Sequence, residues 1–191
     1  MPDYVLPALT RAAADPEEIV RCAVAAAIAQ LAETSQRFLE VAQWMRVVSL
    51  RREASGARAA AAAAAASGGR ERKDSSAATL QSFDSELTDL QEQVFRIVMK
   101  LIMDPLTTAA VKRALLVDIT RLCLFMQRKQ TNDQLLPLLI SFFNDRETSL
   151  RVALLESIAG VCAFLGPESL ELFVMPCILQ VSRAPNPPTH P

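Results

Sequence analysis

Two stretches of the chain align without a gap: VKRALLVDITRLCLF at 111–125 and LRVALLESIAGVCAF at 150–164. A third stretch, VRCAVAAAIAQLAET at 20–34, follows the same pattern. In each, alanine lies 3, isoleucine 8 and an apolar residue 11 positions after the first residue. These offsets share one face of an α-helix, so the same helix face recurs three times. The predicted repeat-stacking core is Val20, Ile28, Leu31, Val111, Ile119, Leu122, Leu150, Ile158 and Val161.

An aspartate lies a few residues before each of these helices, twice followed by proline. Aspartate can cap the first turn of a helix, and proline is tolerated at the first helical position. Each helix then has a basic residue near its start, and we expect this residue to hydrogen-bond the turn aspartate of its own or the next repeat. A functional basic stripe is the alternative interpretation. The predicted turn and ladder residues are Asp15, Arg21, Asp104, Lys112, Asp145 and Arg151.

A second, upstream helix in each unit is marked by an apolar residue and proline, as at Leu6-Pro7, Leu136-Pro137 and Met175-Pro176. The interval from Pro137 to Pro176 is 39 residues, the same as from Lys112 to Arg151. A period near 40 residues built from two helices is typical of HEAT repeats. Because one helix pair cannot cover its own apolar face, we predict an all-α solenoid of about three and a half stacked hairpins.

The expected first helices span roughly 3–14, 84–103, 132–144 and 168–181, and the second helices roughly 17–42, 107–129 and 147–165. These give HEAT repeat 1 at 1–45, repeat 2 at 83–130, repeat 3 at 131–166 and the first helix of a truncated repeat 4 at 167–182. A Pro-rich tail, 183–191, follows.

The segment 46–82 interrupts the repeats and has low complexity, with eight alanines at 59–66 and a Gly/Ser run after them. It holds seven basic and three acidic residues. Such a composition predicts a disordered insert, although alanine itself favours helix. A basic arm for an acidic partner or a membrane is the alternative.

Composition and motifs exclude most chemistry. The four cysteines never form CxxC and the single histidine, His190, lies in the tail, so we expect no metal site and no catalytic cysteine or serine. The sequence contains no P-loop, GxGxxG, HRD or DFG motif, so no catalytic residue and no cofactor are expected. A net charge of −1 does not indicate nucleic acid as a partner. Neither a membrane-spanning run nor a signal peptide is expected.

Several segments resemble the class III phosphatidylinositol 3-kinase regulatory subunit, the vacuolar protein sorting subunit with a kinase-like domain, HEAT repeats and a WD-type propeller. The densest resemblance is ITRLC at 119–123 with NDQLL at 132–136, and YVLP at 4–7, LAET at 31–34 and RFLE at 37–40 fit as well. The resemblance covers about 4–180, interrupted by the insert. Pro167 departs from it, since the family tends to have tryptophan there.

This resemblance implies a non-catalytic scaffold whose partners are the lipid kinase catalytic subunit and its adaptor, acting in endosomal and vacuolar sorting and in autophagy. It also implies a cytoplasmic location, peripheral to endosomal and autophagic membranes, with membrane contact only through the complex. Two alternatives stay open. One is a HEAT scaffold of another complex, such as a protein phosphatase 2A structural subunit or a transport receptor. The other is part of a serine/threonine protein kinase whose catalytic domain is missing here.

Overall fold

The computed structural model describes the backbone of residues 2–64 and 75–183. Every element in these ranges is helical and none is a strand, which confirms the all-α prediction. Two elements, η1 and η2, are single π-helical turns. The elements are α1 (Pro2–Ala12), α2 (Glu18–Ala64), α3 (Ser75–Met103), α4 (Ala109–Val117), α5 (Ile119–Gln130), η1 (Thr131–Leu135), α6 (Leu136–Phe143), α7 (Thr148–Leu165), α8 (Pro167–Ser169), η2 (Leu170–Val174) and α9 (Met175–Arg183).

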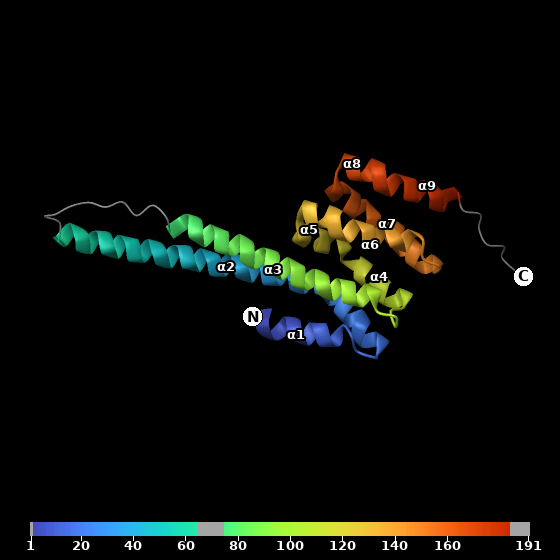
Figure 1. Ribbon diagram of the computed structural model, residues 1–191, viewed down its shortest axis with the longest axis horizontal. Coiled ribbons are helices and arrows are strands. Elements are labelled where there is room, and N and C mark those ends of the chain that lie inside the picture. The colour runs from blue at the N-terminus through green and yellow to red at the C-terminus, as the bar shows by residue number, and fades with distance from the viewer. Residues whose placement is uncertain (1, 65–74, 184–191) are drawn as a thin grey trace, which may run out of the picture.

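The helices stack in chain order, from α1 at one end of the described molecule to α9 at the other (Figure 1). α2 packs against α1, α3, α4 and α5, and α7 packs against α4, α5 and α6. Each helix therefore contacts the elements of its own hairpin and of the next one. This nearest-neighbour packing is that of a solenoid.

One continuous apolar core runs through the stack, and the predicted repeat positions line it. Val20 and Leu31 are only partly buried, because the first hairpin has a packed neighbour on one side only among the described helices. The other seven predicted core residues are buried: Ile28, Val111, Ile119, Leu122, Leu150, Ile158 and Val161.

The prediction of a disordered insert over 46–82 is wrong for 46–64 and 75–82, which are helical. α2 is 47 residues long and α3 is 29, and the two helices form a long hairpin that projects from the solenoid (Figure 1). Helix continues into the insert because alanine has the highest helix propensity and because each helix lies along the other. An ion pair between Arg46 and Glu86 joins them at 2.9 Å. The Gly/Ser and basic run at 67–73 and the tail from 184 lie outside the described residues.

The expected helix 107–129 is divided in two places. It bends at Asp118, where α4 ends and α5 begins. It breaks again at Gln127, whose φ of 62° and ψ of 164° are not helical. Thirty-nine residues later, Gly166 has almost the same conformation, with φ 93° and ψ 165°. The period seen in the sequence thus reappears as a repeated backbone break at the end of the second helix.

A π-helical turn occurs at the same place in two repeats, Thr131–Leu135 and Leu170–Val174. Each turn ends two residues before a proline, Pro137 or Pro176. Proline has no amide hydrogen, and its ring clashes with the carbonyl four residues earlier in a regular α-helix. A wider turn relieves that clash, so the apolar-Pro pair marks a π-bulge in these two repeats, whereas α1 continues as α-helix through Pro7.

Candidate functional site

The three predicted aspartates each close a turn between helices. The Oδ1 atoms of Asp15, Asp104 and Asp145 accept hydrogen bonds from the backbone N–H two residues later, at 2.9, 2.8 and 3.1 Å. This is an Asx turn, which fixes the chain before the helix starts. The predicted capping of the first helical turn is therefore replaced by a turn-forming role.

Arg21 ties two consecutive turns together. Its Nη1 atom donates to the carbonyl oxygens of Asp15 at 2.6 Å and Pro16 at 3.0 Å, and its Nη2 atom donates to that of Leu106 at 2.9 Å. The residue is only 3% exposed. Among the described residues, no base reaches the Asp104 carboxylate, because Arg21 bonds a carbonyl further along that turn instead.

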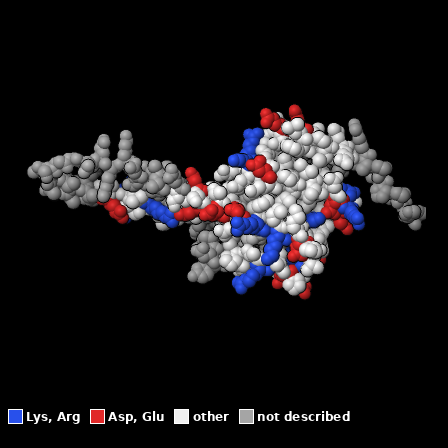
Figure 2. All heavy atoms as spheres, viewed as in Figure 1, with Lys and Arg blue, Asp and Glu red and all other residues white. Residues whose placement is uncertain are grey.

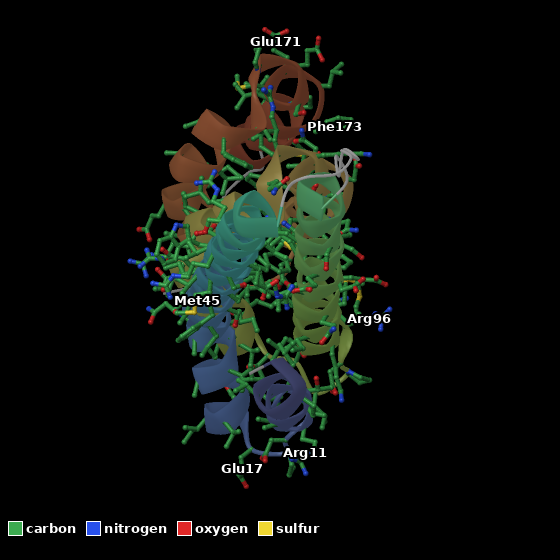
Figure 3. The ribbon with its side chains drawn as sticks, turned by 90° about the vertical axis from the view of Figure 1, so that its left-hand side faces the viewer. Arg11, Glu17, Met45, Arg96, Glu171 and Phe173 are labelled. Atoms are coloured by element: carbon green, nitrogen blue, oxygen red, sulfur yellow. The ribbon has the colours of Figure 1, made fainter. Side chains whose placement is uncertain are left out.

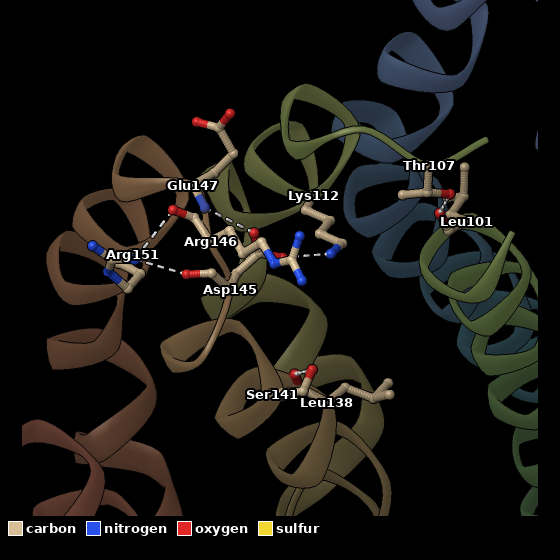
Figure 4. Close-up of polar contacts among 9 residues, drawn as sticks. All are labelled: Leu101, Thr107, Lys112, Leu138, Ser141, Asp145, Arg146, Glu147 and Arg151. Atoms are coloured by element: carbon tan, nitrogen blue, oxygen red, sulfur yellow. Dashed lines mark hydrogen bonds and ion pairs between the residues drawn. The ribbon is translucent and has the colours of Figure 1, made fainter. Parts of the chain in front are cut away.

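Lys112 and Arg151 converge on the third turn (Figure 4). The Nζ atom of Lys112 lies 2.7 Å from Oδ2 of Asp145, which belongs to the next repeat. It also lies 5.5 Å from the centroid of the Phe142 ring, a cation–π distance. Arg151 donates from Nη1 to the carbonyl oxygen of Asp145 at 2.7 Å. The three bases and their turns form a polar ladder along one edge of the stack, which we call the turn ladder.

The electrostatics of the turn ladder follow from these contacts. The hydrogen bond from Lys112 is the largest cause that lowers the pKa of Asp145, against the opposing effect of burial. The side chains of the pair are about one-fifth exposed, so solvent screens their attraction only in part. The pair therefore favours the packed arrangement at neutral pH.

The four cysteines are free thiols, of which Cys123 is buried and the other three are partly buried. Cys123 is fully buried, and burial raises its thiol pKa to about 12. Burial also raises the pKa of Cys22 and Cys162. Such thiols are protonated and poor nucleophiles at neutral pH. Within the described ranges, no group of three or more His, Cys, Asp or Glu side chains could hold a metal ion.

Two buried polar side chains that the sequence analysis missed support the break at Gln127. Gln91 donates from Nε2 to the carbonyl oxygen of Phe125 at 2.8 Å, and Thr131 donates from Oγ1 to that of Cys123 at 3.0 Å. Both carbonyls lie in the last turns of α5, where the backbone leaves the helical conformation, and a buried unpaired carbonyl there would be costly. In the sequence, both are polar residues among apolar ones, and this pattern could have identified them as buried polar side chains.

Gly160 lets α7 approach α5 closely. A Cβ atom at this position would lie 2.5 Å from Oγ1 of Thr120, closer than real contacts allow. The repeat alignment places Gly160 next to the core position Val161. Only the packed helices reveal which small side chain is required.

Two grooves lie on the described surface between helices. One of about 320 Å³ lies between α1 and α3 and is lined by Leu6, Pro7, Thr10, Gln93, Arg96, Ile97 and Lys100. Another of about 350 Å³ lies between α2 and α5 and is lined by Glu33, Gln36, Arg121, Leu124 and Phe125. None of the groups with a shifted pKa lines either groove.

Charge on the described surface is mixed in sign. Figure 2 shows small groups of acidic and basic side chains on one face and a broad uncharged area over α5, α6 and α7. By length and composition, α7 passes the test for a membrane-crossing helix, with a mean hydropathy of 1.6, and 28% of it is buried. It packs against α4, α5 and α6, so its apolar character fits a helix between repeats.

Comparison with known proteins agrees with this architecture. Residues 1–182 match the family model described as PIK3R4-like, middle domain. The chain is 39% identical over 177 residues to the probable serine/threonine-protein kinase vps15 of Dictyostelium discoideum, covering 92% of this chain and 8% of the relative. It is 36% identical over 157 residues to the serine/threonine-protein kinase VPS15 of Arabidopsis thaliana, covering 82% of this chain and 10% of the relative.

The stacked hairpins with a 39-residue period define an α-solenoid of helical repeats. The chain belongs to the PIK3R4-like middle-domain family, the family of the class III phosphatidylinositol 3-kinase regulatory subunit Vps15. It spans about a tenth or less of the length of the curated relatives it matches. The matched region is the middle domain and not a kinase domain.

Proposed function

We propose that this chain is a non-catalytic scaffold segment of a class III phosphatidylinositol 3-kinase complex. The observation that carries the proposal is that the basic side chains at the repeat positions bond the turns between helices. Arg21, Lys112 and Arg151 are engaged in the turn ladder, where they fix one repeat against the next. A regular stack with grooves free of shifted acids or thiols supports a role in positioning other proteins.

The partners we propose are the lipid kinase catalytic subunit and its adaptor. The proposed setting is cytoplasmic, at endosomal and autophagic membranes, in vacuolar sorting and autophagy. These proposals rest on membership of the Vps15 family. The relatives are named serine/threonine-protein kinases, and we assign that activity to parts of those proteins outside the matched middle domain.

A chimeric protein tests the scaffold role. Residues 1–182 replace the matched region of the Dictyostelium vps15, and the assembled lipid kinase complex is purified and assayed for phosphatidylinositol 3-phosphate. The chimera is expected to assemble and to support lipid phosphorylation. A matched chimera carrying Leu150→Asp and Ile158→Asp breaks the core between repeats and should lose assembly. Normal assembly by the broken chimera would contradict a scaffold role for this segment.

The absence of catalysis is tested separately. Isothermal calorimetry of the 191-residue chain with ATP and Mg²⁺ is expected to give no saturable heat, because no phosphate-binding motif was found in the sequence. A catalytically active kinase segment requires nucleotide binding. Saturable binding with a defined stoichiometry would therefore overturn the non-catalytic assignment.

A further inference from the structure

The projecting part of α2 carries an apolar stripe that no described helix covers. Its members are Phe38, Val41, Trp44 and Met45, which are 55, 49, 65 and 60% exposed. Spacings of three and four residues place them along one side of the helix, and we call this set the α2 stripe. Figure 3 shows Met45 on the side of α2 that is turned away from α3.

The opposite side of the same segment is already occupied. Leu39 packs against the apolar core, and Arg46 pairs with Glu86 of α3. The side of this segment that faces α3 and the core is therefore already packed, whereas the α2 stripe faces outward. Contiguous exposed apolar side chains on a soluble protein mark a contact surface.

Charged side chains of both signs flank the α2 stripe, with Glu33 and Glu40 near its first turn and Glu53 directly after Arg52. Arg37 lies beside Phe38, and Arg51 and Arg52 both follow about two turns beyond Met45; all three are exposed. Arg37 is paired with Glu33, whereas Arg51 and Arg52 take part in no ion pair recorded among the described residues. Helices that lie in a membrane interface typically combine tryptophan and phenylalanine with nearby arginine. Their rings enter the boundary of the acyl chains, and their basic side chains contact anionic headgroups.

The size of the stripe argues against a second copy of the chain as its occupant. Four side chains that are about half exposed offer on the order of 400–500 Å², below the roughly 800 Å² per partner of a standard protein interface. A lipid surface needs no such minimum, because each buried ring and each base near the headgroups adds to the affinity. At the C-terminal end of the stripe, Arg51 and Arg52 outnumber Glu53, and this local excess of positive charge matches a negatively charged surface.

We propose that the α2 stripe, with Arg51 and Arg52, binds an anionic lipid surface directly. The helix lies flat on the interface, with Trp44 and Met45 inserted and α3 on the water side. This inference goes beyond the scaffold role and revises the expectation that the chain meets membrane only through its complex. It holds or fails independently of which protein partners the solenoid binds.

The chain reports on this site through its own fluorescence, because Trp44 is its single tryptophan. The 191-residue protein is mixed with vesicles of phosphatidylcholine alone or with 30% phosphatidylserine, a composition chosen as about that of a strongly anionic membrane. The anionic vesicles are expected to shift the emission to shorter wavelength, to co-sediment with the protein and, when brominated, to quench Trp44. Raised salt should weaken the binding.

Variants on and off the stripe make the assignment specific. Met45→Glu keeps Trp44 as the probe and should weaken vesicle partitioning about tenfold or more, because a charge replaces an inserted apolar group. Arg51→Gln and Arg52→Gln should each cost about fivefold on anionic vesicles and little on neutral ones. Val117→Glu on α4 is the matched control, since Val117 is 75% exposed and lies off the stripe; it should bind like the unchanged protein.

Three results would each overturn the proposal. One is an unchanged emission and no co-sedimentation at millimolar anionic lipid. Another is vesicle binding that Met45→Glu leaves intact. The third is a blue shift that grows with protein concentration in the absence of lipid, together with a dimer mass in sedimentation equilibrium, which would assign the stripe to a second copy of the chain.

Discussion

Gln127 holds a backbone conformation that glycine adopts easily and other residues rarely do. Its φ of 62° and ψ of 164° fall in a region populated essentially by glycine. Strain of this kind costs about 1–3 kcal/mol. Gly166 occupies the equivalent place 39 residues later at φ 93° and ψ 165°, so the repeat itself shows which residue the position favours.

The perturbation is Gln127→Gly. Glycine removes the strain, and its extra freedom in the unfolded chain offsets about 0.5–1 kcal/mol of that gain. The Gln127 side chain is exposed, so little packing is lost. The net expectation is an increase of about 1 kcal/mol in the free energy of unfolding, or roughly 2–4 °C in Tm for a chain of this size.

Urea denaturation followed by far-UV circular dichroism measures the change. Gln127→Ala is the matched control, since alanine also removes the side chain but leaves the strain, and it should give no comparable gain. Gly166→Ala should destabilise, because the positive φ strains any residue with a Cβ, and that Cβ would clash with Nη2 of Arg128. If Gln127→Gly lowers the stability or matches Gln127→Ala, the argument from backbone strain is refuted.

Three further predictions concern packing, pH and thiol reactivity. Gly160→Ala should lower stability by about 0.5–2 kcal/mol, because the clash with Thr120 outweighs the roughly 0.5–1 kcal/mol that alanine gains over glycine inside a helix. Thr120→Ala in the same chain should restore the loss in thermal melts, and no rescue would exclude this contact as the cause. The low pKa of Asp145 in the folded chain means that its pair with Lys112 stabilises above the unfolded value near 4 and loses this effect as pH falls through the folded value. Lys112→Met should therefore lower the free energy of unfolding by about 1 kcal/mol at pH 7 and by progressively less as the pH falls below about 4, and a loss that does not depend on pH would show that the pair with Asp145 is not its cause. Cys123 should resist maleimide labelling at pH 7 until urea unfolds the chain, as mass spectrometry of its peptide can establish; rapid labelling of the folded chain would contradict its burial.

The insert shows where composition misleads. Residues 46–64 have the low complexity of a disordered segment, yet they continue α2. The composition of this segment shows that it lacks an apolar period, but it contains no information about the helix that packs beside it. Whether such a segment orders depends on α3 lying alongside, which is a property of the packed hairpin.

The turn ladder was predictable in its members and not in its bonds. The spacing of aspartates and basic residues pointed to these positions, but not to the bonds by which Arg21 reaches the Leu106 carbonyl and Lys112 the Asp145 carboxylate. Side-chain length and the offset between neighbouring hairpins decide those partners. The α2 stripe was likewise hidden, because exposed and buried apolar residues look alike in sequence.

The sequence by itself determined the helical class, the 39-residue period and most of the core, because these follow from the spacing of apolar residues along a helix. Tertiary structure alone decided which of the small residues permits close packing, where the backbone breaks and which apolar side chains stay in solvent. Those properties depend on distances between segments far apart in the chain, and a one-dimensional pattern contains no such distances.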